Sequence, residues 1–239
     1  MTGPRRFAGD MTTSTFRRDV AATSLVVTAV LSAVSTATAP EFPSGYTDRL
    51  AAIDQAGALS WVSALTFTLA QLPFLVAVLG VGHLLRDEAS RLSVVGVCLA
   101  SVGAFGHAVF GGVSLVSVVM AQDAATRSTS AALLADVEGS PVMLFAAMGL
   151  LGTVFGLLVL AAALWRTQVA PRWVPVLVAA FLVVEFVGGN LASWAPQLSA
   201  VLYLVAFGAL ARTVHAQATD DAASRTGLGH DVPAPAVPA

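Results

Sequence analysis

The stretch Val94–Ala121, VVGVCLASVGAFGHAVFGGVSLVSVVMA, decides the fold. As a helix rising about 1.5 Å per residue, it is long enough to cross a hydrocarbon core about 30 Å thick. On that helix Gly96, Gly103, His107 and Gly111 share one face because they recur at helical spacing. Small side chains let helices approach closely in lipid. The stretch therefore predicts a membrane span with a packing face into which one histidine is set.

Composition places the rest of the chain in the membrane as well. The 239 residues are 56% hydrophobic and 11% charged, whereas about a quarter of the residues in soluble domains are charged. The net charge is -2, and the 12 basic residues are all arginine and thinly spread. No basic patch marks a surface for nucleic acid, so we exclude that class of partner. The expected surroundings are a lipid bilayer.

Apolar segments predict an all-α, polytopic membrane helix bundle with six transmembrane helices. The predicted spans are residues 22–39, 59–85, 94–121, 141–165, 173 to about 190, and 198–214. Residues 1–20 are predicted as a flexible cytoplasmic leader, 21–215 as the transmembrane domain and 216–239 as a disordered cytoplasmic tail. The first span is weakly hydrophobic and ends in an A-x-A sequence, so a cleaved secretory signal is the alternative.

The arginines predict the orientation of the chain. With six spans, ten of the 12 basic residues fall on the side of the two termini, and only Arg49 and Arg127 fall on the other. The positive-inside rule then places both termini in the cytoplasm, in a multi-pass protein of the cytoplasmic membrane.

Two segments indicate a parallel two-hairpin internal repeat. LAAIDQAG (50–57) is similar to ALLADVEG (132–139), and each precedes a descending span, an arginine-bounded turn and an ascending span. The ascending spans carry His107 and Glu185, each ahead of a glycine pair. Such units would be related by an axis along the membrane normal. Chance alignment of alanine-rich helices is the alternative.

Three segments carry a resemblance to a known group of proteins. LPFLVAVLGVGHLLR (72–86), LASVGAFGHAVFGG (99–112) and ALWRTQVAPRWVP (163–175) resemble multi-span integral membrane proteins of actinobacteria. The resemblance covers roughly residues 20–215 and implies a six-helix architecture. It brings no substrate, cofactor or catalytic residue with it.

Polar residues inside the predicted spans give the candidate site. Gln71, His107 and Glu185 lie within about 5 Å of one another along the membrane normal when depth is counted from the nearest inner arginine. Glu185 is the only carboxylate well inside a span, where a charge costs about 2.5 to 3.5 kcal/mol. We hypothesise a contact of Glu185 with His107, near Gln71, in a polar pocket between the second, third and fifth spans. The alternatives are that His107 is a structural hydrogen-bonding residue and that Glu185 meets water.

Other sequence features have simpler explanations. Gly152 and Gly156 form a small-xxx-small element that predicts helix packing, either within the chain or against a second copy in a homodimer. His83 and His107 are too far apart in depth to flank a haem iron. No hydrolase or metalloprotease motif occurs, so we predict neither a catalytic residue nor a metal or cofactor.

Two functions remain open at this point. The first is a structural or accessory membrane protein that packs through its glycine faces. The second is a small proton-linked transporter or ligand-binding membrane protein that uses Glu185, His107 and Gln71.

Overall fold

The computed structural model describes residues 6–41, 43–188 and 191–227, and throughout these ranges the regular elements are α-helices. The predicted all-α class is confirmed. The helices, in chain order, are α1 (Arg6–Thr38), α2 (Tyr46–Ala56), α3 (Ala58–Leu85), α4 (Ser90–Ala121), α5 (Arg127–Glu138), α6 (Met143–Thr167), α7 (Trp173–Phe186) and α8 (Ala195–Gly227).

Five of the helices in the described chain are long and apolar enough to cross a membrane: α1, α3, α4, α6 and α8. The remaining apolar helix, α7, has 14 residues, which gives it a length of about 21 Å. The fifth span was predicted to reach about residue 190. The helix instead ends at Phe186, and residues 189–190 lie outside the described residues.

The two end helices are longer than their predicted spans. α1 begins at Arg6 and α8 continues to Gly227, so helix extends into the segments predicted as a flexible leader and a disordered tail. Extending an existing helix adds a hydrogen bond for each residue without a new nucleation cost. Both helices therefore continue past the ends of their apolar segments into polar sequence.

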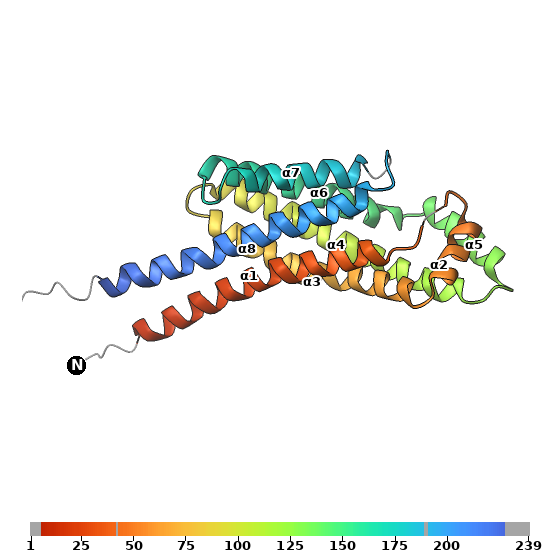
Figure 1. The fold of residues 1–239 in the computed structure, drawn as a ribbon, viewed down its shortest axis with the longest axis horizontal. Coiled ribbons are helices and arrows are strands. Elements are labelled where there is room, and N and C mark those ends of the chain that lie inside the picture. Colours follow the sequence, from red (N-terminus) through yellow and green to blue (C-terminus); the bar gives the residue numbers. More distant parts are fainter. Residues whose placement is uncertain (1–5, 42, 189–190, 228–239) are drawn as a thin grey trace, which may run out of the picture.

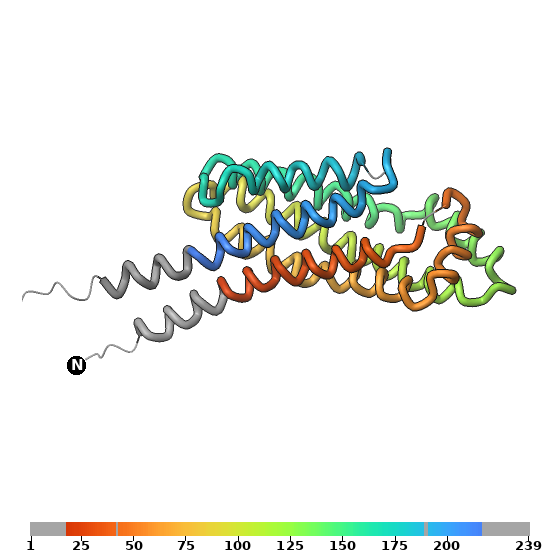
Figure 2. Tube along the Cα trace, viewed as in Figure 1, coloured from red at the N-terminus to blue at the C-terminus, as the bar shows by residue number. Residues whose placement is uncertain are grey.

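The apolar helices form a closed ring. In order around it, α1 packs on α3, α3 on α4, α4 on α6, α6 on α7, α7 on α8, and α8 on α1. Figures 1 and 2 show an elongated bundle in which both ends of the described chain lie at one end. The turns after α3 and α6 lie there too. We call this the terminal end, and the opposite end, where α2 and α5 lie, the cap end.

Large apolar side chains cover the outside of the ring. Leu72 and Leu79 of α3, Phe105 of α4 and Phe155 of α6 are all exposed. Exposed apolar residues spread over many turns of parallel helices are expected where lipid chains replace water as the surrounding solvent. The outer surface therefore fits a multi-pass membrane protein in contact with a bilayer.

Glycines allow α4 and α6 to pack closely. A Cβ atom at Gly152 would lie 2.5 Å from the backbone nitrogen of Gly103, and one at Gly156 would lie 2.7 Å from the Cα of Ala100. A Cβ at Gly96 would lie 2.8 Å from Cγ of Leu160. No side chain larger than hydrogen fits at such distances unless the helices separate.

Gly111, nearer the C-terminal end of α4, faces a different neighbour. A Cβ at Gly111 would collide with the hydroxyl of Thr68 on α3. The five glycines predicted to pack helices therefore all face other helices of the same chain. None of these contact faces is left open for a second copy.

The two short helices α2 and α5 pair at the cap end (Figure 1). Arg127 Nη2 of α5 lies 2.7 Å from Asp54 Oδ2 of α2, and a hydrogen bond links Tyr46 to Glu138 at the opposite ends of the same two helices. Because each helix start meets the other helix's end, the pair is antiparallel. Its buried side chains pack on α3 and α4, which fixes it to that half of the ring.

Candidate functional site

A cavity of about 120 Å³ lies inside the ring, and all of the ring helices contribute to its wall. Polar residues are numerous in its lining, among apolar and aromatic ones. Seven of its lining residues carry hydroxyl groups: Thr28, Ser32, Ser35, Thr36, Thr153, Ser199 and Tyr203. A polar cavity of this size inside an apolar bundle has room for waters or a small solute.

The three residues singled out from the sequence all line this cavity. Gln71 reaches it from α3, His107 from α4 and Glu185 from α7. These helices correspond to the second, third and fifth predicted spans. The wall is wider than the predicted pocket, because α1, α6 and α8 also contribute to it.

His107 is held in place by α3 and α6. Its Nδ1 lies 3.3 Å from the hydroxyl of Thr153, and its ring meets the ring of Phe67 edge-on, with centroids 5.6 Å apart. A Cβ at Gly149 would lie 2.5 Å from Cδ2 of His107. The absence of a side chain at Gly149 therefore makes the room that the imidazole occupies.

Glu185 lies in the last turn of α7 and accepts a hydrogen bond from the hydroxyl of Ser199 on α8. Tyr203, one turn further along α8, is close enough to feel the charge of Glu185 and lies beside Thr28 and Ser32 of α1. None of the ion pairs found among the described residues includes Glu185. Its polar partner is thus a neutral hydroxyl.

The hypothesised contact between Glu185 and His107 does not occur as a hydrogen bond in the described part of the chain. Each of the two groups bonds to a hydroxyl instead, Glu185 to Ser199 and His107 to Thr153. The physical reason is that a serine or threonine on the adjacent helix of the ring lies within reach of each polar group. Glu185 and His107 share a cavity without pairing directly.

Gln71 lies just before the proline of α3. Its Nε2 donates to the carbonyl of Phe67, 2.9 Å away in its own helix. Pro73 removes one backbone donor from the helix, and near it Thr28 of α1 donates to the carbonyl of Ala70 at 3.1 Å. The carbonyl that loses its helical donor is that of Leu69, four residues before the proline. Thr28 bonds to the next carbonyl, so a neighbouring helix adds a hydrogen bond to the backbone close to the proline.

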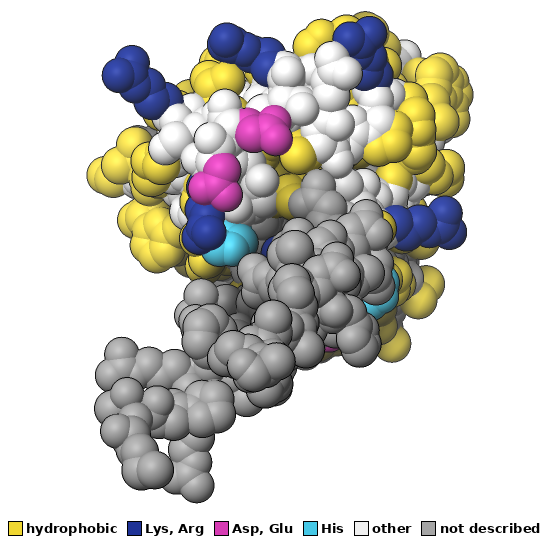
Figure 3. Space-filling model, turned by 90° about the vertical axis from the view of Figure 1, so that its left-hand side faces the viewer, with side chains coloured by type: hydrophobic (Ala, Val, Ile, Leu, Met, Phe, Trp, Pro, Cys, Tyr) yellow, Lys and Arg dark blue, Asp and Glu magenta, His cyan; other side chains and the backbone are white. Residues whose placement is uncertain are grey.

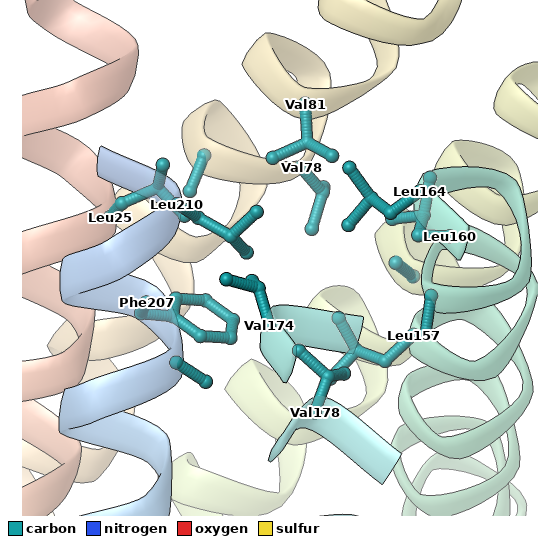
Figure 4. Packing of buried hydrophobic residues seen from close by; sticks show 14 of the residues in the cluster. Leu25, Val78, Val81, Leu157, Leu160, Leu164, Val174, Val178, Phe207 and Leu210 are labelled. Carbon is teal, nitrogen blue, oxygen red and sulfur yellow. The ribbon is translucent and has the colours of Figure 1, made fainter. Parts of the chain in front are cut away.

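The floor of the cavity, toward the terminal end, is apolar. Figure 4 shows side chains of α1, α3, α6, α7 and α8 pointing toward one another there. They enclose a second void of about 20 Å³, lined among others by Leu25, Val81, Leu164, Val178 and Leu210. These residues lie on the terminal side of the cavity-lining residues of the same helices. The floor therefore separates the cavity from that end of the bundle.

Sequence reasoning missed the contributions of α1 and α8. Thr28, Ser32 and Ser35 recur at steps of four and three, so they share one face of α1, and Ser199 and Tyr203 are one turn apart on α8. The sequence did carry a signal for these two cavity-lining faces, because hydroxyl residues recur at helical spacing in weakly apolar spans.

Charged side chains gather at the terminal end. Figure 3 shows dark blue basic side chains spread around this end of the molecule. The exposed arginines of the turns and of α8 there are Arg86, Arg91, Arg166, Arg172 and Arg212. His83 and His215 bond to side chains near this end, at 3.2 Å to Arg86 and 3.3 Å to Asp19. Within the described ranges no three His, Cys, Asp or Glu side chains group as metal ligands.

Comparison of the chain with protein-family models, with curated proteins and with solved structures found no match. The site must therefore be interpreted from its own geometry.

Proposed function

We propose that this chain is a six-span protein of the cytoplasmic membrane that binds a small solute in its central cavity from the outer side. The observation that carries the proposal is the cavity itself: Gln71, His107 and Glu185 reach one space from three helices, among seven hydroxyl residues. Polar groups inside a membrane bundle are costly to maintain and mark solute or proton pathways. Glu185 and His107 are the acid and base groups of the wall, so a proton-linked form of this function would use them.

The orientation rests on charge. The arginine-rich terminal end faces the cytoplasm, since basic residues are retained on that side, and the apolar floor then separates the cavity from the cytoplasm. Under this orientation the cap end faces outward. Transport would require the floor to open, so binding alone is the minimal function.

The sixth span of this proposal is α7. Its helix is short, but Phe181, Glu185 and Phe186 line the polar cavity, where a membrane helix does not have to cross the full hydrocarbon thickness on its own. The closed ring supports this count, because α7 joins α6 to α8 within it.

A parallel repeat accounts for the order of the helices. The units α2–α3–α4 and α5–α6–α7 each consist of a short helix, a long apolar helix and a returning helix. The returning helices carry His107 and Glu185, which both line the cavity. Duplication of one unit would bring two polar residues to the centre of one ring. The resemblance to actinobacterial multi-span proteins, which implies a six-helix architecture, is also part of what we propose.

Retention of the first span also follows from the cavity. α1 supplies four of the hydroxyl residues in the wall and packs on both α3 and α8. Cleavage as a secretory signal would remove one side of the site.

The proposal is tested by thermal unfolding of the full-length protein in detergent. A panel of small ammonium salts, carboxylates and neutral polyols is added at equal concentration. We expect at least one class to raise the melting temperature of the wild type, and Ala200→Phe, which fills the cavity, to abolish the rise. Ala162→Phe, at an exposed position of α6, is the matched control that keeps it. A panel without any effect on the wild type would contradict the proposal.

A structural or accessory role is the second candidate. The observation that favours it is the close glycine contact of α4 with α6, and a bond such as His107 to Thr153 then only holds helices together. Gly112 and Gly208, with nothing within 4 Å of an added Cβ, would be the small residues available to a second copy or a membrane partner. Under this role Ala200→Phe would leave stability unchanged or raise it by filling a void.

A further inference from the structure

We infer that the solute is a small organic cation that carries an ammonium group. The inference rests on the proposed function, because it names the class of ligand for the same cavity. Three properties of the wall support it: its charge, its aromatic rings and its size.

The wall carries one carboxyl group, that of Glu185, and one imidazole, that of His107, which bonds to the hydroxyl of Thr153. Among the residues that line the cavity, Glu185 is the only carboxylate, and neither arginine nor lysine is present. Glu185 has a serine hydroxyl as its hydrogen-bond partner and takes part in no ion pair among the described residues. An ionised carboxylate in this setting needs a compensating positive charge, which a bound cation would provide.

Aromatic rings complete the surroundings of such a cation. Phe67, Phe74, Phe181, Phe186 and Tyr203 all line the cavity. Their faces attract ammonium groups, and the attraction strengthens where water is excluded. Tyr203 is fixed between two rings, with centroids 4.7 Å from Phe181 and 4.0 Å from Phe207. The rings are thus held in place before a ligand arrives.

Size and lining argue against the other ligand classes. Anions such as carboxylates and phosphates are bound through arginine, lysine or protonated histidine. This wall lacks arginine and lysine, and its imidazole, that of His107, bonds to Thr153. A bare metal ion is surrounded by oxygen ligands at short distances, whereas a cavity of about 120 Å³ with five aromatic rings suits a larger and softer cation. The hydroxyl groups can accept hydrogen bonds from its N–H groups.

Binding to the full-length protein in detergent tests the inference, by calorimetry and by the shift in melting temperature. The probes are ethylammonium and tetramethylammonium chloride, with sodium chloride at the same concentration as the reference. We expect both ammonium salts to stabilise the wild type relative to sodium chloride. Glu185→Gln should weaken binding about tenfold or more, as expected for the loss of a charged partner. The matched control Glu88→Gln, at an exposed turn position, should bind as the wild type does.

A second pair of variants keeps the test valid if Glu185→Gln does not fold. Phe181→Leu should weaken binding about threefold to thirtyfold, the loss expected from one cation–π contact. Phe155→Leu, at an exposed position on α6, should have no effect. Equal stabilisation by sodium and ammonium salts would overturn the inference. Stabilisation by carboxylates or polyols that Ala200→Phe abolishes would overturn it as well, while the proposed function would stand.

Discussion

Glu185 and His107 show how single polar side chains are accommodated inside this bundle. Each lines the cavity with part of its surface and bonds to a hydroxyl on an adjacent helix, Ser199 for the carboxyl and Thr153 for the imidazole. A side-chain hydrogen bond between helices in lipid is worth about 0.6 kcal/mol on average and up to about 2. Such bonds stabilise the ring by joining adjacent helices across the cavity wall.

The pairing pattern predicts which double mutants couple. Glu185→Gln and Ser199→Ala should be non-additive in the free energy of unfolding, by about 0.5 kcal/mol or more, because they remove two halves of one interaction. Glu185→Gln and His107→Ala should be additive, since the two groups bond to different residues. Unfolding in detergent measures both cycles. A coupling as large between Glu185 and His107 as between Glu185 and Ser199 would contradict this pairing.

A pH-dependent prediction concerns Tyr46, at the cap end. Its pKa is raised above the ordinary value, chiefly by the hydrogen bond to Glu138, then by partial burial and by the carboxylate charge. A raised pKa means that the folded state favours the neutral phenol. The contribution of Tyr46 to stability is therefore present below about pH 10, and it is lost as the pH rises through the pKa of Tyr46 in the folded state.

The measurement for Tyr46 is a near-ultraviolet absorbance titration. The chain has 2 tyrosines, so Tyr203→Phe leaves Tyr46 as the only one that is observed. Adding Glu138→Gln should move the titration to lower pH. Glu88→Gln should leave it where it was. An unchanged titration in Glu138→Gln would show that the two side chains do not interact in solution.

At the scale of whole helices, sequence spacing predicted which face of a helix packs. It predicted less well which other helix packs against that face. The stripe of small residues in α4 was identified as a packing face, but spacing alone does not say that Gly103 meets α6 while Gly111 meets α3. Gly149, whose missing side chain makes room for His107, was not found although Gly152 and Gly156 follow it at steps of three and four, because spacing does not show which glycine faces a large side chain.

The limits of the helices were predicted unevenly. The apolar content of α3 and α4 set their C-terminal ends correctly, at Leu85 and Ala121. The helix of the fifth span was overestimated because the residues after Phe186 carry no charge, and an uncharged segment does not show where a helix ends. Likewise, the equal depth of Gln71, His107 and Glu185 in the membrane predicted that they reach one cavity. It did not predict the hydroxyl groups that bond to Glu185 and His107.

The contact of α4 with α6 predicts a contrast between two glycines of one helix. Gly103→Ala should destabilise the protein by about 1 to 3 kcal/mol, because the added methyl group would collide with the backbone nitrogen of Thr153 and overpack the interface. Gly112→Ala should be neutral or stabilising by up to about 1 kcal/mol, since nothing lies within 4 Å of the added atom and alanine favours helix. Thermal unfolding in detergent compares the two. Equal effects would mean that the close approach is absent in solution.

The molecule as a whole is asymmetric from end to end. The terminal end carries exposed arginines around an apolar floor, and the cap end carries the paired helices α2 and α5 (Figures 1 and 3). Between them lies the cavity that Gln71, His107 and Glu185 line. This arrangement puts the closed, apolar part of the bundle toward the terminal end and the cavity nearer the cap end, as the proposed filling from the cap end requires.

The orientation of this asymmetry is the last prediction, and it depends on the arginines alone. Cysteines are introduced singly at Ser128, in α5 at the cap end, and at Ser90, at the start of α4 near the terminal end. Cys98, the one native cysteine, is replaced by alanine in both variants. In intact cells a membrane-impermeant thiol reagent should label Ser128→Cys and not Ser90→Cys, and both should label once the membrane is permeabilised. Labelling of Ser90→Cys alone would invert the orientation and place the mouth of the cavity on the cytoplasmic side.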